Sequence, residues 1–387
     1  MPSAQTIAIP RASNAFRVLV VDDSAVIRGL ISRWLEEDPA IQVVASAANG
    51  AIALSMAKKT QPELVILDIE MPEMDGLTAL PLLIEAVPGV QVIMASTLTL
   101  RNADISLRAL QMGAADYIPK PESRGQVASS LDFRREVVEK VKALGAAARR
   151  TRGLMPPTTM RGPAIHDHAT AEIAGAPASK PPLALSLRPM TLEGPPRVLA
   201  IGASTGGPQA LFEIFKTLKN DIKIPVVLTQ HMPVAFTAIL ADHLQRLSGI
   251  PAREGVDGET LEPGRIYVAP GDYHMLVEEA DGAPRIRITQ DPPENFCRPA
   301  VDPMFRSLAK VYGPRVLSVI LTGMGQDGLK GAREVVAGGG ILLAQDAATS
   351  VVWGMPGTVA KAGICHAVLP LGEIAPRLKR LLRGESR

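Results

Sequence analysis

The chain has 387 residues, of which 47% are hydrophobic, so it is long enough for two domains with separate cores. Its formal net charge of +2 gives no overall attraction to nucleic acids or membranes, and no apolar run reaches membrane-spanning length. The N-terminus lacks a charged segment followed by an apolar core, so we expect no signal peptide. Two cysteines, Cys297 and Cys365, form neither a disulfide framework nor a metal-ligand spacing; this suits a reducing cytoplasm, and we interpret each as a small core or surface residue.

Residues 16 to about 123 alternate short apolar runs with amphipathic stretches, which is the pattern of a doubly wound parallel sheet. We predict five strands with helices between them. The strands cover residues 17–21, 43–45, 64–67, 92–95 and 115–118, and the helices cover residues 24–37, 48–59, 78–86 and 103–112.

Polar side chains stand where these strands end. They are Asp22 and Asp23 after the first strand, Asp68 after the third, Ser96 after the fourth and Lys120 after the fifth. Carboxyl ends of parallel strands meet at one edge of a sheet, so we expect these groups to lie together. Clustered carboxylates need a cation, and hard oxygen ligands favour Mg²⁺; one carboxylate could then attack a phosphoryl group while the cations neutralise its charge. A helix cap or turn is the better explanation for any one of these aspartates, but a poor one for the set.

The composition changes after the fifth strand. Residues 128–150 have the spacing of an amphipathic helix that closes the first domain. From residue 151 to residue 196 the chain is rich in Pro, Ala, Ser and Thr without periodicity, which predicts a partly extended, mobile linker. We therefore divide the chain into a first domain, an interdomain helix with the linker, and a second domain, at residues 16–135, 136–196 and 197–385.

The second domain opens with a glycine-rich turn between an apolar run, Val198 to Ile201, and a stretch of helical spacing. The turn carries Ser204 in the pattern G-x-S-x-G. This geometry lifts one side chain to the carboxyl edge of a sheet, where a serine could act as a nucleophile. The pattern is short, and a structural or phosphate-binding turn explains it as well, so the serine needs a base and an orienting partner elsewhere in the chain.

Two later strand ends can supply these partners. The run 224–229 leads into His231, whose near-neutral pKa in water suits a general base. The run 316–321 leads into a second glycine-rich turn with Asp327, which could cap the helix that follows it or accept a hydrogen bond from the histidine. The chain order Ser, His, Asp differs from the Ser, Asp, His order of α/β-hydrolases.

The rest of the second domain predicts further strands at residues 262–272, 285–289 and 341–346. Between them, Asp302 has the position of a helix N-cap. His274 lies beside a hairpin-like segment, and we interpret it as a structural histidine.

The first domain resembles the receiver domain of two-component response regulators, which has a flavodoxin-like fold. The matching positions are Asp22-Asp23, Asp68 with Met71-Pro72 and Asp75-Gly76, Ser96, and Lys120-Pro121. The resemblance implies that Asp68 accepts the phosphoryl group and that Asp22, Asp23, Asp68 and the main-chain carbonyl of Glu70 bind Mg²⁺. It also implies that Ser96 and Lys120 sense the phosphoryl group and that Tyr117 is the aromatic switch. The sensing hydroxyl is a serine here instead of the threonine usual in the family.

The second domain resembles the catalytic domain of the chemotaxis protein-glutamate methylesterase family, known as CheB. The matching motifs are residues 202–207, 230–233, 298–302, 323–328, 345–346 and 353–356. The resemblance implies a mainly parallel, doubly wound α/β domain with no cofactor in the esterase site. It makes Ser204 the nucleophile, His231 the general base, Asp327 its orienting carboxylate, and the main-chain N–H of Met324 part of the oxyanion hole. The linker is long and proline-rich for this family.

Together the resemblances imply a cytoplasmic methylesterase that is activated by phosphorylation. It would hydrolyse glutamate γ-methyl esters on methyl-accepting chemotaxis receptors, release methanol, and deamidate selected receptor glutamines. A histidine kinase would be the phosphodonor, Mg²⁺ the receiver's cofactor, and neither nucleic acid nor membrane insertion would be involved. Two alternatives are a receiver joined to a helix-turn-helix DNA-binding unit, and a regulator that binds its target without catalysis.

Overall fold

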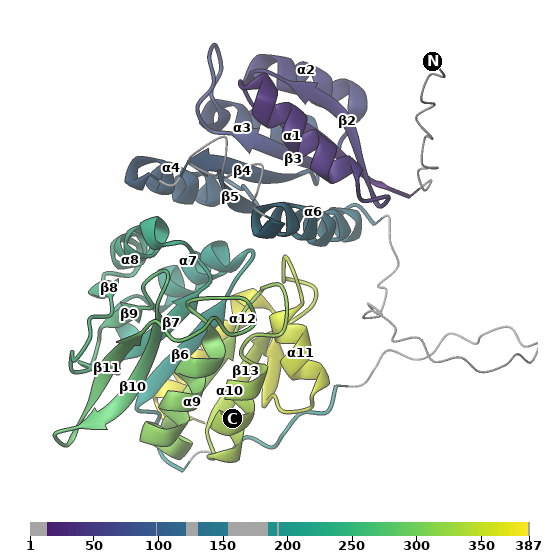
Figure 1. The fold of residues 1–387 in the computed structure, drawn as a ribbon. Helices are drawn as coiled ribbons and strands as arrows, with labels where there is room; N and C mark the ends of the chain where they lie inside the picture. The colour runs from purple at the N-terminus through teal and green to yellow at the C-terminus, as the bar shows by residue number, and fades with distance from the viewer. Residues whose placement is uncertain (1–13, 98, 121–130, 154–184, 192, 386–387) are drawn as a thin grey trace, which may run out of the picture.

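The structure is a computed structural model that describes residues 14–97, 99–120, 131–153, 185–191 and 193–385. Two α/β domains follow one another along the chain, and one long helix, α6 (Leu131–Thr151), lies between them (Figure 1). Most of the predicted linker lies outside the described residues. None of the described helices is long and apolar enough to cross a bilayer.

The first domain is a five-stranded parallel sheet, as predicted, and its strand order is β2-β1-β3-β4-β5. The helices α1 to α4 each follow the strand of the same number. The strands are β1 (Phe16–Val21), β2 (Ile41–Ala47), β3 (Leu64–Asp68), β4 (Gln91–Thr97) and β5 (Asp116–Lys120), and the helices are α1 (Ala25–Glu36), α2 (Gly50–Thr60), α3 (Gly76–Ala86) and α4 (Leu100–Gln111).

Each of these four helices begins at a side chain that caps its first turn. Ser24, Asn49, Asp75 and Thr99 accept a hydrogen bond from the main-chain N–H three residues later, at 3.4, 2.9, 2.7 and 3.2 Å respectively. The caps place each helix start beside the carboxyl end of the preceding strand. They therefore help to shape the edge where the acidic cluster lies.

Helix α6 packs on the first domain through an apolar stripe. Val137, Val141 and Leu144 are fully buried in the same cluster as the β1 side chains. Near its other end, Arg149 forms a buried ion pair with Glu63, with Nε 2.5 Å from Oε1. The helix thus closes the first domain, as the periodicity predicts, and it runs through the expected boundary at residue 135.

The second domain contains a seven-stranded parallel sheet with the order β14-β13-β12-β6-β7-β9-β8. A separate antiparallel hairpin, β10 with β11, packs beside it. The strands are β6 (Val198–Ala203), β7 (Val226–Gln230), β8 (Ala252–Glu254), β9 (Ile266–Val268), β10 (His274–Ala280), β11 (Ala283–Thr289), β12 (Val316–Ile320), β13 (Ile341–Gln345) and β14 (Ala367–Leu369). The helices are α7 (Gly207–Leu218), α8 (Val234–Ser248), α9 (Val301–Tyr312), α10 (Leu329–Ala337), α11 (Met355–Lys361) and α12 (Leu371–Leu382), with 3₁₀ turns at Lys219–Asp221 and Gly313–Arg315.

The expectation that Asp302 caps a helix is wrong. Helix α9 begins at Val301 with Ala300 at the cap position, and Asp302 lies inside the first turn. Its carboxylate instead accepts hydrogen bonds from Gly331 N, at 2.7 Å, and from Asn295 Nδ2, at 3.0 Å. His274 is buried and binds main-chain groups, with Ala300 N 3.2 Å from Nδ1, which fits a structural role.

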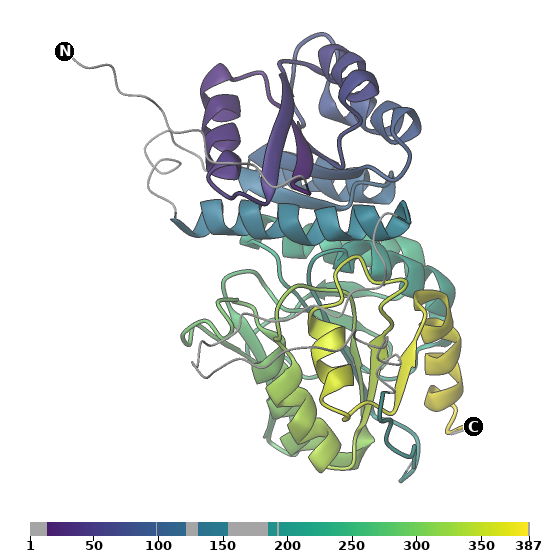
Figure 2. The same ribbon diagram turned by 90° about the vertical axis from the view of Figure 1, so that its right-hand side faces the viewer.

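The two domains meet through α4 and β5 of the first and α7 and α8 of the second (Figure 1), and α6 lies along the junction (Figure 2). Tyr117 stacks on Phe236 with ring centroids 4.3 Å apart, inside a continuous cluster of buried apolar side chains from both domains. Polar contacts surround this stack. His243 Nε2 lies 3.0 Å from Asp104 Oδ1, and Gln209 Nε2 donates to Ala115 O at 3.1 Å.

Candidate functional sites

Ser204 and His231 follow two neighbouring strands at the same edge of the second sheet. Ala203 and Gln230, the last residues of β6 and β7, are paired in the ladder. The His231 main-chain N–H donates to Ala203 O at 3.1 Å, and Gln230 Nε2 donates to Ser204 O at 2.9 Å. The parallel pairing therefore brings the predicted nucleophile and the predicted base to one side of the domain, where both side chains are partly exposed.

Two glycines shape the turn around the serine. Gly206 has a left-handed backbone, with φ of 74°, and precedes the first residue of α7. Gly323 lies so close to the serine that a side chain there would place its Cβ 2.8 Å from Ser204 Cβ. Met324, the predicted oxyanion residue, follows Gly323 directly, so its main chain belongs to the turn that packs against Ser204.

Asp327 is buried and is surrounded by hydrogen-bond donors. Its Oδ2 lies 2.8 Å from His231 Nε2 and accepts from Val301 N at 2.6 Å. Its Oδ1 accepts from Asp302 N, Gly328 N and Asn295 Nδ2 at 3.1, 2.9 and 2.9 Å. The carboxylate thus binds both the N-terminus of α9 and the imidazole. It does not cap α10, the helix that follows it, because that helix has no side-chain cap. Burial raises the pKa of Asp327, but the imidazole and the N–H donors outweigh it, so the pKa falls below its usual value.

His231 lies between Asp327 and a residue that sequence reasoning missed. Its Nδ1 is 3.5 Å from the thiol of Cys297, and no hydrogen bond of the described residues joins Nδ1 to the Ser204 hydroxyl. Burial lowers the pKa of His231, but Cys297 and the hydrogen bond with Asp327 outweigh it and raise the pKa to about 10. The imidazole therefore has a carboxylate at Nε2 and a thiol at Nδ1. No spacing links Cys297 to His231 in the sequence; the only signal is its place directly before the 298–302 motif.

At the edge of the first sheet, Lys120 binds two of the three predicted carboxylates. Its Nζ lies 2.6 Å from Asp22 Oδ2 and 2.7 Å from Asp68 Oδ1. Asp23, which is exposed, completes the cluster, and each of the three carboxylates offers an oxygen within 4.8 Å of the others. Burial, with a contribution from Asp22, raises the pKa of Asp68 to about 6, although Lys120 acts in the opposite direction.

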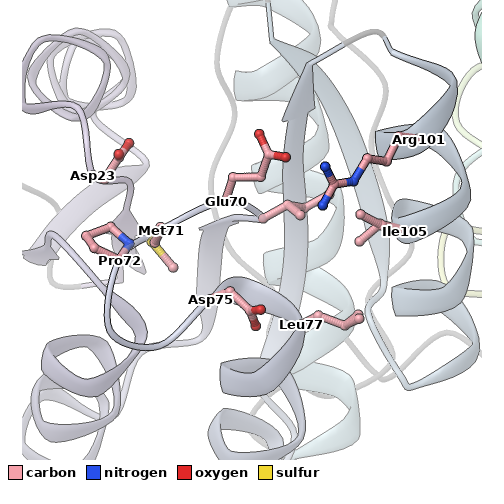
Figure 3. Close-up of a pocket in the computed structure, with 9 residues that line it drawn as sticks. Asp23, Glu70, Met71, Pro72, Asp75, Leu77, Arg101 and Ile105 are labelled. Atoms are coloured by element: carbon pink, nitrogen blue, oxygen red, sulfur yellow. The ribbon is translucent and has the colours of Figure 1, made fainter.

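The donor set of this acidic cluster fits a hard divalent cation. It consists only of carboxylate oxygens, and the single ammonium group of Lys120 offsets only part of their negative charge. A pocket lined by Asp23, Glu70, Asp75 and Arg101 opens beside it, and in Figure 3 the Arg101 side chain extends from α4 toward Glu70.

The two remaining residues predicted for the receiver, Ser96 and Tyr117, are both buried. Ser96 is buried, and its hydroxyl accepts a hydrogen bond from Ser106 Oγ at 3.0 Å, a partner on α4 that the sequence did not indicate. Tyr117 is buried in the interface between the domains. Burial and the nearby Asp116 raise the pKa of its hydroxyl.

Two family models match separate parts of the chain. The family model described as CheB methylesterase matches residues 199–378, and the one described as response regulator receiver domain matches residues 18–132. The crystal structure of the Thermotoga maritima CheB methylesterase catalytic domain is 40% identical and covers 48% of this chain and 98% of that chain, with a TM-score of 0.47.

Two curated relatives match almost the full length. The protein-glutamate methylesterase/protein-glutamine glutaminase of group 2 operon from Rhodospirillum centenum is 53% identical over 388 residues, covering 98% of each chain. The protein-glutamate methylesterase/protein-glutamine glutaminase 1 from Paramagnetospirillum magneticum is 56% identical over 372 residues, covering 96% of this chain and 97% of that one. Because more than half of the residues are identical over nearly all of both chains, the chain belongs to the CheB family of receiver-linked protein-glutamate methylesterase/protein-glutamine glutaminases.

Proposed function

We propose that the chain is a phosphorylation-activated hydrolase that uses Ser204, His231 and Asp327 to cleave glutamate γ-methyl esters on chemoreceptors. The observation that carries this proposal is the 2.8 Å hydrogen bond between His231 Nε2 and the buried Asp327, placed at the strand edge where Ser204 lies. This bond leaves Nδ1 as the nitrogen that can exchange a proton in the cleft.

In the acylation step the Ser204 hydroxyl attacks the ester carbonyl and its proton passes to His231 Nδ1. The imidazolium is stabilised by Asp327, which its own N–H donors keep charged. The main-chain N–H of Met324 stabilises the oxyanion, and the protonated imidazole gives its proton to the departing methanol. Water then hydrolyses the acyl-serine by the same proton transfers in reverse order. A glutamine side chain undergoes the same acyl chemistry with ammonia as the leaving group, which accounts for a deamidase activity.

The receiver would gate this chemistry through α6, which contacts one residue near His231 and one near the serine turn. Arg135 lies over the ring of Phe296, 4.8 Å from its centroid, beside Cys297. Arg150 donates to Val351 O at 3.1 Å, and Val351 adjoins the serine turn, since a Cβ on Gly206 would lie 2.6 Å from Val351 Cβ. Phosphorylation of Asp68 would shift the populations toward an arrangement in which α6 leaves the cleft open.

In the receiver, Asp22, Asp23, Asp68 and the Glu70 carbonyl would hold Mg²⁺, which supplies positive charge beside the phosphoryl group. Lys120 stabilises the phosphorylated Asp68, and Ser96 and Tyr117 respond to it. A histidine kinase of the chemotaxis type is the phosphodonor. The substrates are the cytoplasmic helices of methyl-accepting receptors, so the enzyme acts in the cytoplasm.

The test is methanol release from methylated receptor, with and without a small-molecule phosphodonor. The parent protein should release methanol faster with the phosphodonor. Ser204→Ala should release none in either condition while keeping its thermal unfolding midpoint, because the hydroxyl is the only group it removes. Thr205→Ser, next to the nucleophile, is the control for local disturbance. Unchanged release by Ser204→Ala would reject the nucleophile assignment.

A further inference from the structure

One of the two cysteines lies beside the catalytic base and within reach of solvent. Cys297 Sγ is 3.5 Å from His231 Nδ1, on the edge of the ring that faces away from Asp327. Cys297 is partly exposed, whereas Cys365 is completely buried in the core. A thiol next to a base can transfer its proton as it attacks an electrophile.

The thiol is placed by a tight turn at residues 294–297. Cys297 N donates to Glu294 O at 2.9 Å, and Glu294 N donates to Cys297 O at 3.2 Å. The two central residues, Asn295 and Phe296, are left-handed, with φ of 53° and 64°. Residues other than glycine rarely adopt this backbone conformation, and phenylalanine adopts it less readily than asparagine. Contacts with the surrounding residues must therefore hold the turn.

Those contacts are shared with the catalytic carboxylate. Asn295 Nδ2 donates to Asp327 Oδ1 at 2.9 Å and to Asp302 Oδ2 at 3.0 Å, and Glu294 Oε2 pairs with Arg306 at 2.9 Å. Asp327 therefore positions both the imidazole and the turn that brings the thiol to it. The contact between Cys297 and His231 is therefore held by the hydrogen bonds of Asn295 and Glu294.

We propose that Cys297 is an oxidation site within the esterase cleft, through which peroxides reversibly switch off hydrolysis; this rests on the proposed function. The thiol sulfur attacks one peroxide oxygen, so an S–O bond forms and the O–O bond breaks. The thiol proton passes to His231 Nδ1 and then to the departing oxygen, which leaves as water or an alcohol. Sulfur is oxidised to a sulfenic acid and the peroxide is reduced.

The product would block the base. The added oxygen lies between Cys297 and Nδ1, so His231 can no longer take the proton of Ser204. Two equivalents of a thiol reductant restore the cysteine and yield a disulfide of the reductant and water. The switch is therefore reversible by thiols, which do not reduce methionine sulfoxide.

The experiment exposes the full chain to hydrogen peroxide, removes the peroxide, and measures methanol release relative to each variant's own untreated rate. We expect the parent and Cys365→Ala to lose activity by about tenfold or more and to regain it with dithiothreitol, since only an accessible thiol beside a base reacts. Cys297→Ala and Cys297→Ser should keep their untreated rates. Equal inactivation of the Cys297 variants, or full resistance of the parent, would overturn the proposal.

A second readout does not need esterase activity, so it separates a failure of this proposal from a failure of the proposed function. Mass spectrometry should find iodoacetamide on Cys297 before Cys365, in the parent and in Ser204→Ala alike. His231→Gln should slow the labelling of Cys297 by about tenfold, because the base is gone. Labelling of Cys297 at the same rate without the imidazole would contradict the activated pair.

Discussion

The two domains each bury an aspartate at the end of a parallel strand, yet the two carboxyl groups are shifted in opposite directions. The Asp68 side chain is 8% exposed and that of Asp327 is 2% exposed, so burial alone would raise both pKa values. Burial prevails at Asp68, whose pKa is about 6, whereas the pKa of Asp327 is lowered.

The difference lies in the hydrogen-bond donors. Asp327 receives three main-chain N–H groups, the amide of Asn295 and the imidazole of His231. Asp68 receives Lys120 and the N–H of Ile69, and it has the carboxylate of Asp22 nearby. Asp327 therefore stays ionised, which suits a carboxylate that orients a base. Asp68 is suited to a change of charge, which binding of a cation or a phosphoryl group would bring.

Among the substitutions that test this difference between the two aspartates, Asp327→Asn should have the largest effect on activity. An amide keeps the shape of the side chain but cannot stabilise the imidazolium, and it favours the wrong tautomer of His231. If Asp327 orients the base as proposed, we expect kcat for methanol release to fall by about 10⁴-fold, the effect of an Asp→Asn change in a Ser-His-Asp triad. Circular dichroism should show an unchanged secondary structure.

Asp302→Asn is the matched control for that substitution. Asp302 is equally buried and shares Asn295 with Asp327, but its partners do not include the histidine. The control should lose far less activity than Asp327→Asn. If both variants lost the same activity, Asp327 would have a structural role and would not orient His231.

Asp68→Asn tests the other half of the comparison. A carboxyl group whose folded pKa is raised to about 6 stabilises the protein fully only below its unfolded pKa, and this contribution is lost as the pH rises through 6. At pH 8 the ionised Asp68 therefore costs stability. Removing it should raise the free energy of unfolding by about 1–3 kcal/mol at pH 8, with a smaller gain at pH 5. Urea unfolding with a chelator present measures both.

Asp23→Asn is the control here, because Asp23 belongs to the same cluster but is exposed. It should lack the gain at high pH. Added Mg²⁺ should stabilise the parent more than Asp68→Asn, since a ligand that binds only the folded state stabilises it. A gain that is equal at pH 5 and pH 8 would show that the charge of Asp68 is not its source.

The sheet, and the edge at which each site lies, could be predicted because they follow from local patterns. Apolar runs, caps and glycine turns mark where each strand ends, and parallel strands bring those ends together. In this way the sequence pattern alone places Asp22, Asp68 and Lys120 in one cluster.

Contacts that depend on side-chain direction could not be predicted. Cys297 reaches His231 only because Asn295 and Phe296 adopt left-handed backbones, which no local signal indicates. Asp302 has the residue type of a cap, but the cap position of α9 falls two residues earlier, at Ala300, and the Asp302 carboxylate accepts a hydrogen bond from Gly331 N instead. Tertiary hydrogen bonds decided both positions.

The smallest effect concerns the contact between the domains, on which any response of the esterase to Asp68 depends. Gln111 Nε2 lies 3.1 Å from His243 Nδ1, across the interface beside the Tyr117–Phe236 stack. Gln111→Ala removes one hydrogen bond worth about 1 kcal/mol, so the unphosphorylated enzyme should release methanol about two- to fivefold faster. Arg108→Ala, an exposed position on the same helix, should leave the rate unchanged. In the open arrangement the interface contact is already lost, so the phosphorylated forms of all three proteins should release methanol at the same rate. If unphosphorylated Gln111→Ala released methanol at the rate of the parent, this contact would not hold the two domains in the closed arrangement.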